Sequence, residues 1–246
     1  MTGKKTSLAY KIIKFFVWLF YPKCTVEGAE NLPEEPCIIV GNHAQMNGPI
    51  ACELYFPGKR YIWCAGEMMH LKEVPAYAYQ DFWSKKPKRS RWFYKLLSYI
   101  IAPFSACIFN NANTVPVYHD TRIMATFKSS LKHLEEGASL VIFPEHDEPG
   151  NHILCRFQDK FVDTARMYYK RSGKALVFVP LYVAPELKKL VIGKPVQYRP
   201  EEPIAEERAR ICGEIHAAIT ELAAAQPRHR VVPYKNVPGK FYPYNV

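Results

Sequence analysis

Two strand-like segments of this sequence lead into side chains that could move a proton. The apolar run at 37–41 leads into His43, and the apolar run at 139–143 leads into Glu145. A histidine at a strand end suits general-base work, because the strand fixes its backbone while the following loop admits a substrate. Neighbouring parallel strands end at one edge of a sheet. We therefore expect His43 and Glu145 to lie at the same edge of the sheet, where they would form one acid–base site.

Four segments, taken in order and spacing, form a wider pattern. They are Gly28-Ala-Glu-Asn-Leu-Pro33, the strand ending Asn42-His43, the strand ending Phe143-Pro144-Glu145 and the later Phe178-Val-Pro180-Leu. This pattern resembles the glycerolipid acyltransferase family, which includes the lysophosphatidic acid acyltransferases, over roughly residues 24–225. The resemblance implies acyl transfer from a thioester of coenzyme A or acyl carrier protein to a lipid or lipid-precursor acceptor. It implies no bound cofactor.

The first motif departs from the family pattern. The family has a histidine, four residues and an aspartate, whereas the aspartate position here holds Gly48, preceded by Asn47. Asn47 could orient the His43 ring as a third catalytic residue, but an amide gives no charge support; in serine proteases such a change costs about ten-thousandfold. The alternative for Asn47 is ordinary turn chemistry. A carboxylate of Asp147 or Glu148 could compensate.

The third motif departs as well. In the family it continues with glycine, a hydroxyl residue and arginine, but here with His146, Asp147 and Glu148. The resemblance implies that Glu145 helps to hold the acceptor. Because an acidic loop repels phosphate, this loop favours an amine or a non-phosphate hydroxyl acceptor.

The resemblance places Arg122 roughly where the family has an arginine that binds substrate phosphate. A guanidinium fork matches phosphate oxygens. Since Arg122 also lies early in an expected helix, an ordinary surface salt bridge is the alternative. The expected substrate-binding residues are Arg122, Phe143, Pro144, His146 and Asp147.

The charge pattern indicates contact with a membrane. The formal net charge is +10, which favours an anionic partner. Lysines punctuate the aromatic, aliphatic run at 8–20, and the basic segment 85–91 precedes another such run at 92–101. This is typical of helices lying in a membrane interface. The first run is shorter than the ~20 residues that span a bilayer. The alternative is two core-packed helices with basic solvent faces.

Other features narrow the compartment and the chemistry. The seven cysteines are scattered and form no Cys-x-x-Cys pair, so we expect reduced thiols. No small-residue cleavage site follows residues 8–20, so we expect no signal peptide, and a cytoplasmic protein held peripherally at the inner face of the membrane.

The acidic and histidine cluster at 145–152 lacks metal-ligand spacing, and we expect no metal site. No nucleic-acid motif, phosphate-binding loop or serine nucleophile elbow is present.

The apolar pattern predicts an α/β fold, a single-domain, mostly parallel sheet flanked by helices with an N-terminal amphipathic helix. Expected strands are 37–41, 61–65, 114–118, 139–143, 175–183 and 189–192; expected helices are 48–55, 92–101, 121–136, 157–171 and 206–225. Isoleucines at 211, 215 and 219 with Leu222 predict a docking face. Expected domains are an interface helix at 1–23, an acyltransferase-like domain at 24–225 and an extended C-terminal tail at 226–246.

Together these features predict direct acyl transfer to a lysolipid, glycerol phosphate or related acceptor, with His43 as general base and no covalent acyl-enzyme. Two alternatives stay open. One is a catalytically weak or inactive relative that binds lipid. The other is an acyltransferase for an amine or non-phosphate acceptor. A carboxylate within ~3 Å of His43 would favour catalysis, and a lone ring among apolar side chains would favour the binding protein.

Overall fold

The computed structural model describes residues 6–84 and 86–246 and divides into two compact units. The first unit takes in the chain up to Pro22 together with Trp63–Thr126, and the second takes in Lys23–Ile62 and Phe127–Val246. The first lysine of the expected basic segment 85–91 lies outside the described residues, as do residues 1–5 of the expected interface helix.

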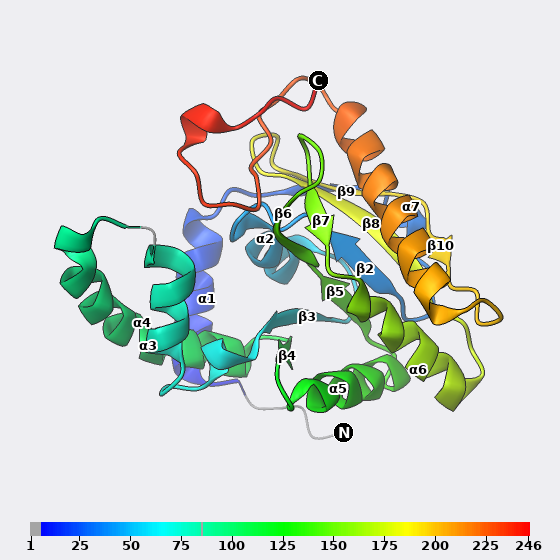
Figure 1. Ribbon diagram of the computed structural model, residues 1–246, viewed down its shortest axis with the longest axis horizontal. Helices are drawn as coiled ribbons and strands as arrows, with labels where there is room; N and C mark the ends of the chain where they lie inside the picture. Colours follow the sequence, from blue (N-terminus) through cyan, green and yellow to red (C-terminus); the bar gives the residue numbers. More distant parts are fainter. Residues whose placement is uncertain (1–5, 85) are drawn as a thin grey trace. The chain divides into compact units, whose positions relative to one another are not determined.

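The second unit contains most of the sheet (Figure 1). Its strands are β1 (Thr25–Glu27), β2 (Ile38–Gly41), the start of β3 (Arg60–Ala65), β5 (Ser139–Ile142), β8 (Val177–Ala184), β9 (Lys189–Ile192) and β10 (Val196–Gln197). The order is β1-β9-β8-β2-β5-β3, and β10 pairs with β8. Strands β3, β5, β2 and β8 run parallel, whereas β9 and β10 are antiparallel to β8. The predicted mostly parallel α/β architecture is confirmed.

Burial on both faces explains the composition of the central strands. Every residue of β2 is buried, as are all but the first residues of β5 and β8. Such strands read as continuous apolar runs because helices or loops cover both faces of a parallel sheet.

The helices of the second unit are α2 (Asn47–Tyr55), the end of α5 (Ile123–Glu135), α6 (Asp163–Ser172) and α7 (Ile204–Ala224), with 3-10 turns η1 (Ala29–Asn31), η5 (Asp159–Val162) and η6 (Gly239–Phe241). Helices α6 and α7 lie side by side, and α7 packs against β8 (Figure 1). The predicted isoleucine face of α7 is fully buried. Gly137 and Gly173 have left-handed backbones just after α5 and α6, the usual place for glycine at a helix end.

The first unit is mainly helical. It contains α1 (Leu8–Phe20), η2 (Gly66–Met69), α3 (Val74–Ala78), the π-helical turn η3 (Tyr79–Trp83), η4 (Lys88–Ser90), α4 (Arg91–Asn111), β4 (Thr114–Val117) and the start of α5; β4 pairs with β3. Its small core is formed by Met68, Val74, Ala78 and Ala102. Helix α1 packs against α4, and the Ser7 N–H donates to Asn111 Oδ1 at 2.9 Å.

Two elements differ from the sequence-based expectation. Helix α4 continues through Pro103 to Asn111, ten residues beyond the expected end at residue 101. The segment after Phe143 and Pro144, expected to be a loop, forms β6 (Glu145–Pro149), which pairs antiparallel with β7 (Cys155–Phe157). The first residues of the expected helix 157–171 accordingly belong to β7 and η5, and α6 begins only at Asp163.

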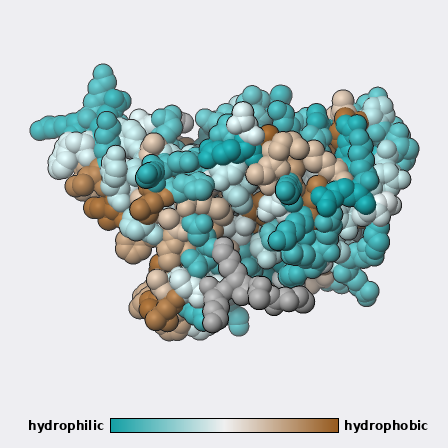
Figure 2. All heavy atoms as spheres, turned by 90° about the horizontal axis from the view of Figure 1, so that it is seen from below, coloured by the Kyte–Doolittle hydropathy of each residue, from teal (hydrophilic) through white to brown (hydrophobic). Residues whose placement is uncertain are grey.

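Large apolar side chains of the first unit are exposed on α1 and α4. They are Leu8, Ile12, Phe15, Phe16, Trp18, Leu19 and Phe20 on α1, and Trp92, Phe93, Leu96, Tyr99, Ile100 and Phe104 on α4. Figure 2 shows part of this surface as brown atoms at the left of the view. Among the described residues, Lys88–Asn111 is the helix long and apolar enough to cross a membrane, by length and composition alone. Exposed large apolar side chains gathered on two packed helices are a feature of interaction surfaces.

Candidate functional site

The two predicted strand ends meet, as expected. Strands β2 and β5 are parallel neighbours with Ile38 opposite Leu140, so their carboxyl ends lie at the same edge of the sheet. The backbone N–H of His43, just beyond β2, donates to Glu145 Oε2 at 2.6 Å. The expected juxtaposition of the two strand ends is therefore present, and the contact joins the Glu145 carboxyl to the His43 backbone N–H.

Glu145 anchors the candidate base. Its side chain is buried, and its other oxygen accepts the Cys155 N–H at 3.0 Å. Burial raises the pKa of Glu145 to about 7. The two backbone N–H groups favour the charged carboxylate and lower this pKa, but burial has the larger effect. Both oxygens are thus engaged by backbone groups on either side of the site, which ties β7 to the His43 loop.

Replacing Glu145 with Gln should destabilise the protein in a pH-dependent way. The unfolded carboxyl titrates near 4.5 and the folded one near 7. The raised pKa therefore contributes stability below pH 4.5, and this is lost as pH rises through 7. In urea unfolding, the free-energy gap between wild type and Glu145→Gln should shrink by up to about 3 kcal/mol from pH 4.5 to pH 8. An amide also leaves one N–H without an acceptor, which adds about 1–3 kcal/mol at every pH.

Glu186→Gln is a matched control. The Arg230 backbone N–H and guanidinium lower the pKa of the Glu186 carboxyl. The difference in unfolding free energy between wild type and Glu186→Gln should therefore stay constant or become smaller as the pH falls. A Glu145→Gln gap that is constant with pH would show that burial does not raise the pKa of this carboxyl.

The His43 ring is oriented by a backbone carbonyl. Its Nδ1 contacts the carbonyl oxygen of Gln45, and because a carbonyl can only accept, Nδ1 carries the proton. In the neutral ring the lone pair therefore lies on Nε2, the form that a general base requires. Phe143 and Tyr234 meet the ring edge-on, with centroids 5.4 Å and 5.7 Å away. A neutral dipole thus occupies the orienting position for which an aspartate was missing.

An unusual backbone brings the Gln45 carbonyl to the ring. Ala44 and Gln45 have φ of 46° and 56°, the left-handed region that non-glycine residues rarely adopt. The Asn47 side chain donates to the Ala44 carbonyl at 2.9 Å, and the Asn47 N–H donates to the same oxygen at 3.1 Å. These two bonds are the turn chemistry weighed as the alternative for Asn47, and they stabilise the loop that carries the base.

The family's aspartate position has no room for a side chain. A Cβ built on Gly48 would lie 2.8 Å from the His43 carbonyl oxygen, 3.0 Å from that of Asn42 and 2.7 Å from Phe143 Cε1. The Phe143 ring occupies this space, and it also lies 3.1 Å from a Cβ built on Gly41. Glycine is thus needed at position 48 because the His43 and Asn42 carbonyls approach it closely. Its backbone conformation is not the reason, since its φ is not in the left-handed region.

The acidic segment after Glu145 lies on an exposed two-stranded ribbon. Asp147 pairs with Lys235 Nζ at 2.9 Å, and His146 Nε2 lies 4.0 Å from Glu148. Pro144 is buried, and its carbonyl accepts the Gln158 N–H at 2.8 Å. Lys235 therefore neutralises part of the acidic charge.

Arg122 belongs to the first unit, where carboxylates surround its guanidinium. Its nitrogens lie 2.8 Å from Asp120, 3.2 Å from Glu73 and 3.9 Å from Glu67. The guanidinium also lies over the Tyr118 ring, 4.1 Å from the centroid. This is the ion-pair arrangement weighed as the alternative to phosphate binding.

Sequence reasoning missed the contribution of the C-terminal segment. Tyr234 packs on the His43 ring, and Tyr242 Oη accepts from Gln45 Nε2 at 3.0 Å. The available signal was the aromatic and basic composition of the tail, which predicted only an extended surface segment.

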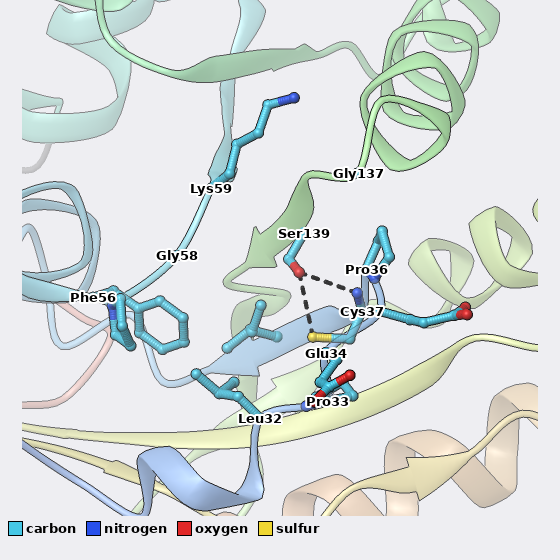
Figure 3. A pocket seen from close by; sticks show the side chains of 13 residues that line it. Leu32, Pro33, Glu34, Pro36, Cys37, Phe56, Gly58, Lys59, Gly137 and Ser139 are labelled. Atoms are coloured by element: carbon cyan, nitrogen blue, oxygen red, sulfur yellow. Dashed lines mark hydrogen bonds between the residues drawn. The ribbon is translucent and has the colours of Figure 1, made fainter.

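A small cavity lies at the opposite end of β2 and β5 from His43 (Figure 3). Its volume is about 130 Å³, and Cys37 and Ser139 line it, with Ser139 Oγ accepting the Cys37 N–H at 3.1 Å. Burial raises the pKa of the Cys37 thiol to about 11, so it is protonated near neutral pH. The Cys37 side chain is therefore not a thiolate nucleophile, and the cavity is separate from the His43 rim. Within the described ranges, no group of three His, Cys, Asp or Glu side chains is placed to hold a metal ion.

Comparison with known proteins supports the fold. No protein-family model matches the sequence, and no curated protein matches it either. Among solved structures, the chain is similar to the 1-acyl-sn-glycerophosphate (LPA) acyltransferase PlsC from Thermotoga maritima, with a TM-score of 0.52 and 19% sequence identity over 89% of this chain and 81% of that one. This similarity shows a shared acyltransferase-like fold.

Proposed function

We propose that this protein is an acyltransferase that moves an acyl group from a thioester donor to a hydroxyl or amine acceptor, with His43 as general base. The observation that carries the proposal is the His43 imidazole at the carboxyl end of β2, held by Gln45 with its lone pair on Nε2. The fold shared with an LPA acyltransferase supports the reaction class.

The reaction needs one proton carrier. Nε2 takes the proton of the acceptor as its oxygen or nitrogen attacks the thioester carbonyl, and a new C–O or C–N bond forms. The tetrahedral intermediate then collapses, the C–S bond breaks, and the thiolate leaves with the proton from Nε2. No acyl-enzyme is required. The Gln45 carbonyl dipole stabilises the imidazolium less than a carboxylate would, which predicts a modest turnover.

A panel assay tests the proposal. Purified protein is incubated with labelled acyl thioesters of coenzyme A and of acyl carrier protein, each with lysolipids, glycerol phosphate, neutral glycerides and amines. Transfer to at least one acceptor, absent without protein, is expected. Saturable binding of lysolipid without transfer from any donor would instead favour the lipid-binding alternative.

The surroundings of Arg122 favour an acceptor without phosphate. A phosphate approaching this guanidinium would meet Asp120 and Glu73, which already accept its hydrogen bonds. Arg122→Ala should therefore change the KM of any acceptor by less than about threefold. Loss of a charge-assisted phosphate contact would instead cost about 1.5–3 kcal/mol, or at least tenfold.

The acceptor KM is measured for Arg122→Ala and for Arg156→Ala, and thermal melting checks that each variant is folded. These KM values decide whether the acceptor carries a phosphate. Arg156 lies on β7, the strand paired with the acidic strand β6, and is a competing phosphate ligand. A large rise in KM confined to phosphate-bearing acceptors in Arg122→Ala would overturn the non-phosphate assignment.

We further propose that the exposed apolar side chains of α1 and α4 contact the membrane that supplies the acceptor. Phe16 and Phe20 stack on one another on α1, both more than half exposed. Phe16→Ser with Phe20→Ser should weaken sedimentation with anionic vesicles at least tenfold, since burying one such side chain is worth about 1.5–3 kcal/mol. The remaining binding should fall as salt rises, because lysines near an anionic surface are screened.

Leu71→Ser is the matched control, since Leu71 of the first unit is also more than half exposed but lies outside α1 and α4. Equal sedimentation of the double variant and the control would remove these helices from the membrane contact.

A further inference from the structure

The C-terminal segment forms a closed loop with a fixed base. The C-terminal loop, defined as residues 232–242, starts after Val231 and ends before Pro243, and the Val231 N–H donates to the Pro243 carbonyl at 2.8 Å. One step further out, the Asn245 N–H donates to the His229 carbonyl at 3.1 Å, while Asn245 Oδ1 accepts the His229 N–H at 2.9 Å. The two ends of the loop are thus paired.

Buried polar side chains attach this base to the core. His229 Nδ1 donates to the Pro227 carbonyl at 2.7 Å, so its Nε2 accepts from the Tyr182 hydroxyl at 2.7 Å. Tyr182 is a buried residue of the central strand β8. Asn245 Nδ2 donates to the Ala223 carbonyl at the end of α7 at 2.8 Å. A fully bonded buried network of this kind fixes geometry, which places the loop on the same rigid sheet as His43.

The loop then reaches the candidate site at three points. The Tyr234 ring packs edge-on against His43 with an interplanar angle of 83°. Gln45 Nε2 donates to Tyr242 Oη at 3.0 Å and approaches the Lys235 carbonyl at 3.4 Å. The Lys235 ammonium pairs with Asp147 on β6. The loop therefore bridges the His43 turn and the β6–β7 ribbon.

The contact through Gln45 matters because of its backbone. Left-handed, non-glycine residues cost free energy and persist only where their surroundings hold them. Gln45 carries the carbonyl that fixes the His43 tautomer, and its side chain is held by Tyr242 of the C-terminal loop. Tyr242, by holding the Gln45 side chain, therefore helps to fix the orientation of the His43 ring.

We propose that Tyr242 and Tyr234 are positioning residues: the C-terminal loop holds the His43 imidazole in one orientation and one tautomer, through the Gln45 side chain and by ring packing. The proposal deepens the proposed function, since it assigns residues that prepare the same base. Neither tyrosine is assigned a proton transfer of its own.

The first experiment needs no substrate, so its outcome is separate from that of the acyl-transfer assay. Full-length protein labelled with ¹⁵N-histidine is recorded by long-range ¹H–¹⁵N correlation, with His43 assigned from the spectrum of His43→Ala. Wild type should show the Nδ1-protonated form alone. Tyr242→Phe removes the acceptor of the Gln45 amide, and Tyr234→Ala removes the ring. Each should move the His43 nitrogen shifts toward a mixture of both tautomers.

Two variants make the result specific. Tyr234→Phe keeps the ring and should restore the wild-type His43 spectrum. Phe241→Ala changes an exposed aromatic residue of the same loop, and its His43 spectrum should match that of wild type. Because Tyr242→Phe removes one oxygen atom, it keeps the test valid if Tyr234→Ala does not fold.

Where turnover is measurable, kcat should fall at least fivefold in Tyr242→Phe and Tyr234→Ala, with KM changed less than twofold. A base that spends part of its time in the wrong orientation lowers kcat without altering acceptor binding. Unchanged His43 nitrogen shifts in folded Tyr242→Phe would overturn the positioning role, whatever the activity of the wild-type protein.

Discussion

His43→Ala is expected to lower acyl transfer at least a hundredfold while the protein stays folded. A positioned general base contributes about 10²–10⁴ in rate, and alanine cannot take the acceptor proton. Stability should change little. The bond that anchors this position uses the backbone N–H, which alanine keeps, and the imidazole is only half-buried. The measurement is initial rate at saturating acceptor, together with a thermal melt.

His119→Ala is the appropriate control, because His119 is exposed on the first unit and has no part in the proposed chemistry. A His43→Ala protein that keeps more than about a tenth of the wild-type rate has lost less than about 1.4 kcal/mol of transition-state stabilisation. In that case His43 is not the base.

Gly48→Asp, which places the family's acidic residue at its expected position, should damage the protein. The new Cβ would meet two backbone oxygens, of His43 and Asn42, which cannot move without distorting the turn. Overpacking of this kind costs about 1–3 kcal/mol, and the displaced turn carries the base. We expect the free energy of unfolding to fall by about 2–3 kcal/mol and turnover to fall at least tenfold.

Gly48→Ala separates the steric effect from the charge, and it should lose nearly as much stability as Gly48→Asp. Gly213→Ala is the control, since Gly213 lies in α7 with open space around its Cβ position. It should gain about 0.5–1 kcal/mol. If Gly48→Asp instead kept its stability and raised turnover, the lack of an aspartate would limit the proposed reaction, and the Gln45 carbonyl would be no adequate substitute.

The parts of the fold that follow from buried side chains were predictable. Strands β2, β5 and β8 are continuous apolar runs, and α7 repeats isoleucine at helical spacing, so burial alone specifies them. The ribbon of β6 and β7 was not predictable, because Glu145–Pro149 is mostly polar and its last three residues are exposed, so that only backbone pairing makes it a strand. The end of α4 was missed because the helix continues through a proline, against the usual effect of that residue.

The candidate site divides in the same way. That His43 and Glu145 would lie together followed from two strand ends of a parallel sheet. Left-handed conformation at Ala44 and Gln45 has no sequence signature, because neither residue is one that favours positive φ. The contacts of Gln45 with Lys235 and Tyr242 join positions nearly two hundred residues apart, and no periodicity in one sequence reveals such a pair.

The wide separation of these partners has a consequence for protein synthesis. Glu145, which anchors His43, leaves the ribosome 102 residues after it, and Tyr242 is made 197 residues after Gln45. Contacts between such distant residues form late in folding, since the closure of a long loop must precede them. A nascent chain would therefore carry an unoriented imidazole until Tyr242 emerges. A truncated product that stops before Tyr242 would therefore be slower in the proposed acyl transfer, even though every strand of the sheet in the described residues is already present.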